Sequence, residues 1–75
     1  MFSYFTTIKG HIISLEYKKT DSIEVIKKKI SKVLKLNWED LCIIFCGREC
    51  KNTDIADNFK FWLKGKPYII YRIRE

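Results

Sequence analysis

The sequence has no long hydrophobic run, a single proline, three glycines and a single histidine among its 75 residues. A membrane-spanning helix needs about 20 apolar residues in succession, so no membrane partner is expected. The low proline and glycine content, with 47% hydrophobic and 15% aromatic residues, excludes collagen-like, low-complexity and disordered chains. The first residues also lack the basic start and apolar stretch of a secretion signal. These absences favour one small folded domain over residues 1–75, with a cytoplasmic and/or nuclear location.

Three cysteines lie close together, at Cys42, Cys46 and Cys50. An odd number of cysteines without a secretion signal argues against a disulfide framework. Their spacing is not that of a zinc site, which usually combines two closely spaced ligand pairs, and His11 lies far upstream. The sequence therefore predicts free thiols and no bound metal.

No arrangement of residues points to catalysis. His11 has no serine or cysteine partner at a motif spacing, and no glycine-rich phosphate loop is present. A domain this small also has little room for an enclosed cleft. We therefore expect no catalytic residues, no cofactor and no enzymatic activity.

The hydrophobic pattern predicts a hairpin followed by one helix. Residues 2–7 are aromatic and β-branched, and residues 11–17 alternate between apolar and polar, on either side of a turn at Lys9-Gly10. Apolar residues then recur at helical spacing from Ile23 to Leu34, after helix-capping residue types, which predicts a helix over 22–34. Lys27 falls at the edge of the apolar stripe, where its stem should be partly buried.

The second half predicts three more strands. Residues 41–45 form an apolar run, Cys46-Gly47 a turn, and residues 48–50 a short return strand. Residues 51–60 are polar and irregular, with Ile55 and Phe59 as expected anchors. The last strand covers 68–74 and is opened by Pro67, which cannot donate a ladder hydrogen bond.

This order of elements predicts an α+β fold. One helix across one face of a mixed four- to five-stranded sheet buries the helical stripe, and the last strand is expected to insert beside the first. This is the β-grasp arrangement.

The residues of this pattern resemble ubiquitin over the whole chain, almost without gaps. The closest stretch runs from Ile13 to Ile30, and the segment Ile43–Gly47 follows the family's Leu-Ile-Phe-Ala-Gly. The identical positions are Met1, Thr7, Gly10, Ile13, Leu15, Glu16, Asp21, Ile23, Glu24, Lys27, Lys29, Ile30, Ile44, Phe45, Gly47, Arg72 and Arg74. The resemblance implies a single ubiquitin-like domain over 1–75.

The departures from the family bear on function. The family's modifiers end in a flexible tail with paired glycines, whereas this sequence reads Arg74-Glu75. Two lysines that carry ubiquitin chains are replaced by Arg48 and Leu63, and an arginine is no amine nucleophile at physiological pH. The resemblance therefore implies a ubiquitin-like protein that is not conjugated to substrates.

The resemblance also implies a binding surface on the exposed sheet face. Its apolar positions are Ile8, Ile44, Tyr68 and Ile70, and its rim positions are Cys42, Arg48 and Arg72. Strand alternation independently places Cys42 with Ile44, and Tyr68 with Ile70 and Arg72. Phe2, Tyr4 and Ile12 form a second outward cluster if Phe5 belongs to the core. Ser3 then occupies an inward position that the family fills with an aliphatic, which should weaken packing or shift the strand register.

The expected function is that of a protein-interaction module. Its partners would be ubiquitin-binding domains or ubiquitin-pathway enzymes, and weak self-association through the apolar face is an alternative. The charge of +6, with five lysines within residues 27–35, also permits a small basic nucleic-acid-binding protein. A third interpretation is a ubiquitin-like domain excised from a larger protein.

Overall fold

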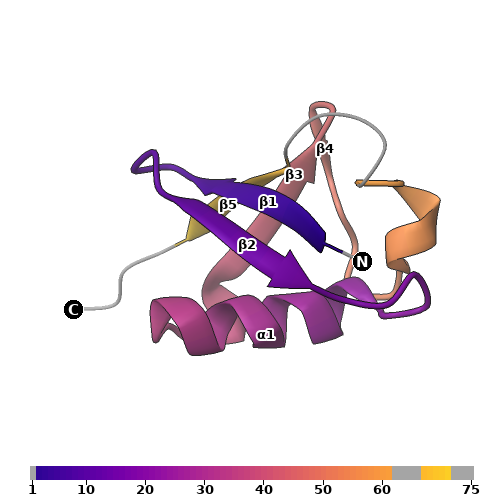
Figure 1. The fold of residues 1–75 in the computed structure, drawn as a ribbon, viewed down its shortest axis with the longest axis horizontal. Helices are drawn as coiled ribbons and strands as arrows, with labels where there is room; N and C mark the ends of the chain where they lie inside the picture. The colour runs from indigo at the N-terminus through magenta and orange to yellow at the C-terminus, as the bar shows by residue number, and fades with distance from the viewer. Residues whose placement is uncertain (1, 62–66, 72–75) are drawn as a thin grey trace.

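The computed structural model describes residues 2–61 and 67–71, which form a five-stranded mixed sheet with one helix across it (Figure 1). The sheet order is β2-β1-β5-β3-β4, with β1 and β5 parallel and the other neighbours antiparallel. The elements are β1 (Phe2–Thr7), β2 (Ile12–Glu16), α1 (Ile23–Leu34), η1 (Trp38–Asp40), β3 (Leu41–Phe45), β4 (Arg48–Glu49), η2 (Ala56–Asn58) and β5 (Tyr68–Tyr71). This is the ubiquitin-like β-grasp topology, which confirms the predicted fold class.

Helix α1 begins at a residue that suits its position and ends at one that does not. The Ser22 hydroxyl accepts a hydrogen bond from the Val25 backbone N–H at 3.2 Å and caps the first turn. The apolar stripe of Ile23, Ile26 and Ile30 is completely buried against the sheet. The helix ends at Lys35 in the left-handed conformation, with φ of 56°. That conformation costs a non-glycine residue about 1–2 kcal/mol.

The buried face of the hairpin contains a serine, and a tyrosine compensates for it. Ser3 and Tyr17 are both buried, and their hydroxyl oxygens lie 2.6 Å apart in a hydrogen bond. The register is undisturbed, with Ser3 opposite Leu15 and Phe5 opposite Ile13. Of the two expected consequences, weaker packing or a shifted register, the register shift does not occur. The Tyr17 hydroxyl pairs with the polar group that Ser3 brings into the core.

Residues 51–61 are held by anchors that differ in part from the expected ones. Ile55 and Phe59 are only half-buried, whereas Ala56 and Phe61 are buried. Lys60 has a φ of 51°, which reverses the chain after η2 and precedes the buried Phe61. The Phe61 ring contacts four aromatic rings at centroid distances of 5.0–6.3 Å, those of Phe5, Tyr17, Phe45 and Phe59.

Pro67 stands directly before β5, as predicted, and its carbonyl accepts a hydrogen bond from the Thr6 N–H at 3.0 Å. The structure describes the last strand to Tyr71, and the predicted continuation to residue 74 lies outside the described residues. Within 2–61 and 67–71, no helix has the length and apolar content that a membrane crossing requires.

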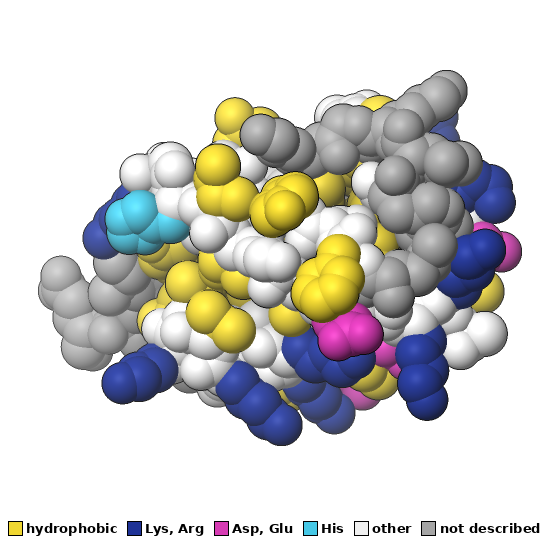
Figure 2. All heavy atoms as spheres, viewed as in Figure 1, with side chains coloured by type: hydrophobic (Ala, Val, Ile, Leu, Met, Phe, Trp, Pro, Cys, Tyr) yellow, Lys and Arg dark blue, Asp and Glu magenta, His cyan; other side chains and the backbone are white. Residues whose placement is uncertain are grey.

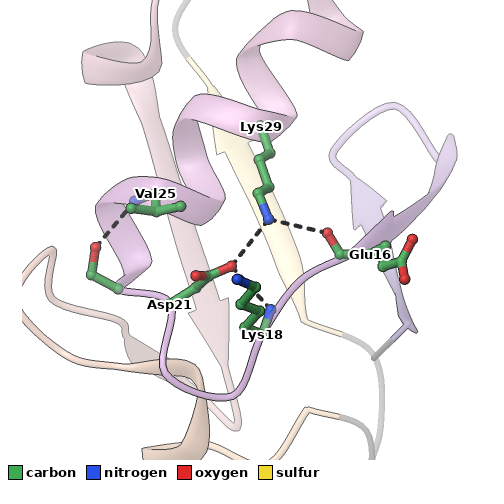
Figure 3. Close-up of polar contacts among 6 residues, drawn as sticks. Glu16, Lys18, Asp21, Val25 and Lys29 are labelled. Carbon is green, nitrogen blue, oxygen red and sulfur yellow. Dashed lines mark hydrogen bonds and ion pairs between the residues drawn. The ribbon is translucent and has the colours of Figure 1, made fainter.

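Asp21 connects the loop before α1 to the helix and to the sheet (Figure 3). Its carboxylate accepts hydrogen bonds from the Lys18 N–H and from Lys29 Nζ, both at 3.0 Å. Lys29 Nζ also donates to the Glu16 carbonyl oxygen at 3.4 Å. The hydrogen bond from the Lys18 N–H and the charge of Lys29 lower the pKa of Asp21 below its usual 3.8, against the opposing effect of burial.

The free energy of unfolding should therefore depend on pH through Asp21. Because its pKa is lower in the folded chain, the stabilisation is present above 3.8 and is lost as the pH falls through the folded pKa. We expect Asp21→Asn to destabilise the domain by about 1–2 kcal/mol at neutral pH. Denaturant unfolding at a series of pH values measures this. The difference between variant and wild type should shrink as the pH falls below 3.8 and through the folded pKa, and a pH-independent difference would contradict the assignment.

Candidate functional site

The sheet face opposite α1 carries a row of apolar side chains. The strand register pairs Ile44 with Tyr68, and Cys42 with Ile70, so these four residues lie on one face as predicted. Tyr68 is 53% exposed and Ile70 is 45% exposed, whereas Cys42 and Ile44 are half-buried. On the same strands, the alternate residues Ile43 and Ile69 are completely buried toward the helix. We call this set of four the β3–β5 patch.

Ile8 lies just after β1, in the turn of the hairpin, and is 52% exposed. It follows the buried Thr7 directly and is exposed at the hairpin end of the sheet. Arg72, which was predicted at the rim of the patch, lies outside the described residues.

The pairing of β4 corrects the expected charge beside Ile44. The two-residue turn at Cys46-Gly47 pairs Phe45 with Arg48, and Ile44 with Glu49. Since directly paired residues share a face, Glu49 and not Arg48 is the β4 residue beside Ile44. Arg48 is exposed, but it pairs with a residue whose side chain is buried. The rim of the patch therefore carries a carboxylate where a guanidinium was expected.

A second acidic residue lies at the other end of the patch. Cys42, Ile70, Asp40 and Tyr71 line a surface hollow of about 320 Å3. Asp40 is the last residue of η1 and directly precedes β3. Its side chain therefore lies next to the apolar residues at this end of the patch. Neither Asp40 nor Glu49 was predicted as a site residue. The two-residue turn was the sequence signal that could have identified Glu49.

The predicted second cluster is continuous with the β3–β5 patch. Phe2, Tyr4 and Ile12 are 58–62% exposed, and Phe5 is completely buried. Thr6 pairs with Ile12 on one side and with Tyr68 on the other, so it joins the two clusters across neighbouring strands. Figure 2 shows hydrophobic side chains gathered over the β1–β2 hairpin. The structure thus brings both predicted clusters onto one sheet face, opposite α1.

The lysines of α1 form a separate surface, and some of them bind polar or acidic side chains of the domain itself. Figure 2 shows cationic side chains along the lower margin of the molecule, where α1 runs. Lys27 is buried more deeply than expected, and its Nζ donates to Asn52 Oδ1 at 2.6 Å. Lys28 forms an ion pair with Glu24 at 3.3 Å and lies over the Trp38 ring, and Lys29 pairs with Asp21. Three of the five clustered lysines thus have structural partners.

The three cysteines, all within the described residues, form no disulfide and differ in exposure. Cys46 is exposed in the β3–β4 turn, Cys42 is half-buried, and Cys50 is buried. Burial and the nearby Asp54 carboxylate raise the pKa of Cys50 to about 12. The described part of the chain contains no group of three histidine, cysteine or acidic side chains that could hold a metal ion.

Thiol alkylation should follow this order of exposure. Because the thiolate is the nucleophile, we expect iodoacetamide to modify Cys46 first and to leave Cys50 unmodified in the folded chain. Peptide mass spectrometry at increasing times measures the order, and all three cysteines should react in denaturant. Modification of Cys50 as fast as Cys46 under native conditions would contradict its burial.

Comparison with known proteins does not assign a function to the β3–β5 patch or to the lysines of α1. No model of a protein family matches this chain, and no curated protein matches it. The structure shows the ubiquitin-like β-grasp topology. The similarity to ubiquitin in individual residues does not assign the chain to a family.

Proposed function

We propose that the domain is a protein-interaction module that binds its partner through the exposed sheet face around Ile44. The observation that carries this proposal is the exposure of apolar side chains along the sheet face opposite α1, from Phe2 and Tyr4 to Tyr68 and Ile70. An apolar patch larger than a few hundred Å2 usually marks an interaction site on a soluble protein. The patch has an apolar centre with charged residues at its edge, which is the usual anatomy of an interface.

The resemblance to ubiquitin suggests the class of partner. Positions Ile8, Ile44 and Ile70 correspond to the apolar surface that ubiquitin receptors recognise, so ubiquitin-binding domains and ubiquitin-pathway enzymes are the proposed partners. Tyr68 adds apolar area and a hydroxyl at the centre of the patch, and tyrosine is enriched among residues that dominate binding energy. Glu49 at the rim favours a receptor with a basic residue beside its apolar contact.

A second candidate function, nucleic-acid binding, rests on the lysines of α1. Lys32 and Lys35 are exposed, and the charge of +6 favours contact with phosphates. Against this function, Lys27, Lys28 and Lys29 are engaged with Asn52, Glu24 and Asp21. The apolar side chains suited to stacking, such as Tyr68, lie on the sheet face, which is opposite the helix. The structure therefore favours the protein partner.

Binding to two probes at several salt concentrations distinguishes the two functions. The probes are a helical ubiquitin-binding domain and a single-stranded oligonucleotide of mixed sequence, each titrated into the chain and followed by fluorescence anisotropy. The proposal expects saturable binding of the ubiquitin-binding domain with a weak dependence on salt. Binding of the oligonucleotide alone, with affinity that falls steeply as salt rises, would favour the second function.

We also propose that Arg74-Glu75 does not serve as a conjugation site. Glu75 stands where the family has the first of its paired glycines, and a charged side chain there should not fit the narrow clefts of activating enzymes. Incubation with a ubiquitin-activating enzyme and ATP should give no thiol-sensitive adduct in a non-reducing gel, with ubiquitin as the positive control. An adduct with this chain would overturn the proposal.

A further inference from the structure

One residue from each strand lines up in a single row across the whole sheet. The strand pairing joins Ile12 to Thr6, Thr6 to Tyr68, Tyr68 to Ile44, and Ile44 to Glu49, in the order of the strands in the sheet. None of these five side chains is buried, whereas the residues directly before and after Thr6 and Ile44 are. The five residues therefore lie on the sheet face opposite α1, and we call them the cross-strand row.

The chemistry of the cross-strand row differs between its two ends. Ile12, at the β2 edge, is 58% exposed, and Tyr68, in the middle, is 53% exposed. Glu49, at the β4 edge, is exposed and ends the row with a carboxylate. A partner that lies along the row therefore meets apolar side chains over most of its length and one negative charge at one end.

The spacing of the row matches the repeat of an α-helix. Neighbouring strands lie about 4.8 Å apart and one helical turn rises about 5.4 Å, so successive turns of a helix laid along the row fall over successive strands. The steps from Ile12 on β2 to Glu49 on β4 cover about 19 Å, which a helix spans in about 13 residues. One stripe of side chains, three or four residues apart, would then contact every strand of the sheet.

A helix that follows the strands would cover less of this face. Within the described residues, β3 and β5 each present only two outward positions. Strand β1 presents three, and Ile8 follows them, but a helix along β1 would lie two strands away from Ile44. The cross-strand row is the direction that joins Ile12 on the hairpin to both Ile44 and Glu49.

We propose that the partner is an amphipathic helix that lies across the strands along the cross-strand row, and that Ile12 and Glu49 determine its specificity. Ile12 requires an apolar residue at one end of the helix, and Glu49 favours a basic residue at the other end. Because the N-terminal end of a helix carries the positive end of the macrodipole, the partner's N-terminal end lies over Glu49. This arrangement rests on the function proposed for the sheet face, and it adds the direction and the charge of the partner.

The direction is tested with a synthetic helix that has one leucine stripe and a lysine near its N-terminal end, acetyl-Ala-Lys-Gln-Ala-Leu-Ala-Gln-Ala-Leu-Ala-Gln-Leu-Ala-Gln-Ala-Leu-Gln-amide. It carries a nitroxide amino acid at its first or its last position and is titrated into the isotopically labelled chain. In nuclear magnetic resonance spectra, the first nitroxide should broaden the amides of Glu49 and Ile44 most, and the last should broaden that of Ile12 most. Absence of a saturable effect on the row, or equal broadening of both ends by both peptides, would overturn the proposal.

Two pairs of variants test the specificity residues with the peptide that has no nitroxide. Ile12→Ala should weaken binding roughly fivefold. Ile8→Ala removes the same side chain at a similar exposure but outside the row, so it should change binding less than roughly twofold. The wild type should prefer the lysine peptide to one with glutamate in its place by roughly three- to tenfold, and Glu49→Lys should reverse this preference. Glu39→Lys, the same change at an exposed residue of η1, should leave it unchanged.

The outcomes separate the cross-strand arrangement from the proposed function. If the peptide binds the β3–β5 patch but Ile8→Ala weakens binding while Ile12→Ala does not, the helix follows the strands. The cross-strand arrangement then fails and the proposed function stands. If the peptide shifts only amides of α1, both fail. An unchanged charge preference in Glu49→Lys would overturn the role of Glu49.

Discussion

Replacing Phe61 with alanine should lower the free energy of unfolding by about 3–5 kcal/mol, the largest loss that we expect from a single substitution. Phe61 is 2% exposed and contacts the aromatic rings that connect the hairpin, β3 and the loop after β4. A domain of this size has a total stability of roughly 4–11 kcal/mol, so the variant should lose much of it. Denaturant unfolding followed by circular dichroism measures the loss.

Phe2→Ala is the matched control, because it removes the same side chain from the opposite face of the sheet. Phe2 is 62% exposed, so this variant should lose less than about 1 kcal/mol. If the two variants are equally destabilised, the assignment of the buried and exposed faces is wrong.

Replacing Ile70 or Tyr68 with alanine should weaken binding of a protein partner by about 1–3 kcal/mol, which is roughly 5- to 150-fold. Both side chains lie near the centre of the β3–β5 patch and are about half exposed in the unbound chain, so the stability should change little. Ile44→Ala should weaken binding by a similar amount. Because Ile44 is half-buried, its loss also removes packing and should cost some stability. Ile70→Ala is therefore the cleaner variant.

The control for these variants lies on the helix. Lys32→Ala removes an exposed charge on the other side of the molecule and should leave both affinity and stability nearly unchanged. Isothermal titration calorimetry with a helical ubiquitin-binding domain measures the affinities. If Lys32→Ala abolishes binding while Ile70→Ala does not, the face assignment fails and the basic helix becomes the binding surface.

The fold could be predicted from the sequence because its elements have clear periodicities. The alternation in the hairpin and the helical spacing of Ile23, Ile26 and Ile30 each allow one buried face, and the structure confirms both. Phe61 was missed because residues 51–61 have no periodicity. Its inward position depends on the left-handed conformation of Lys60, which no residue pattern signals.

The site could be predicted only in part, because strand alternation identifies which residues of one strand share a face but not which residues of different strands meet. Alternation alone grouped Ile44 with Cys42, and the register then placed Tyr68 and Ile70 beside them. The join between the two clusters, through Thr6, depends on the parallel pairing of β1 and β5. Likewise, the run of lysines does not reveal that Lys28 and Lys29 form ion pairs with acidic side chains. The sequence therefore predicted a more positively charged helix surface than the structure has.

Amide chemical-shift changes of the labelled chain during titration with a helical ubiquitin-binding domain identify the face that the partner contacts. We expect saturable shifts concentrated on β3 and β5, at Cys42, Ile44, Tyr68 and Ile70, with little change along the outer face of α1. Shifts concentrated at Lys28, Lys32 and Lys35, with the β3–β5 patch unchanged, would instead mean that the partner binds the basic helix.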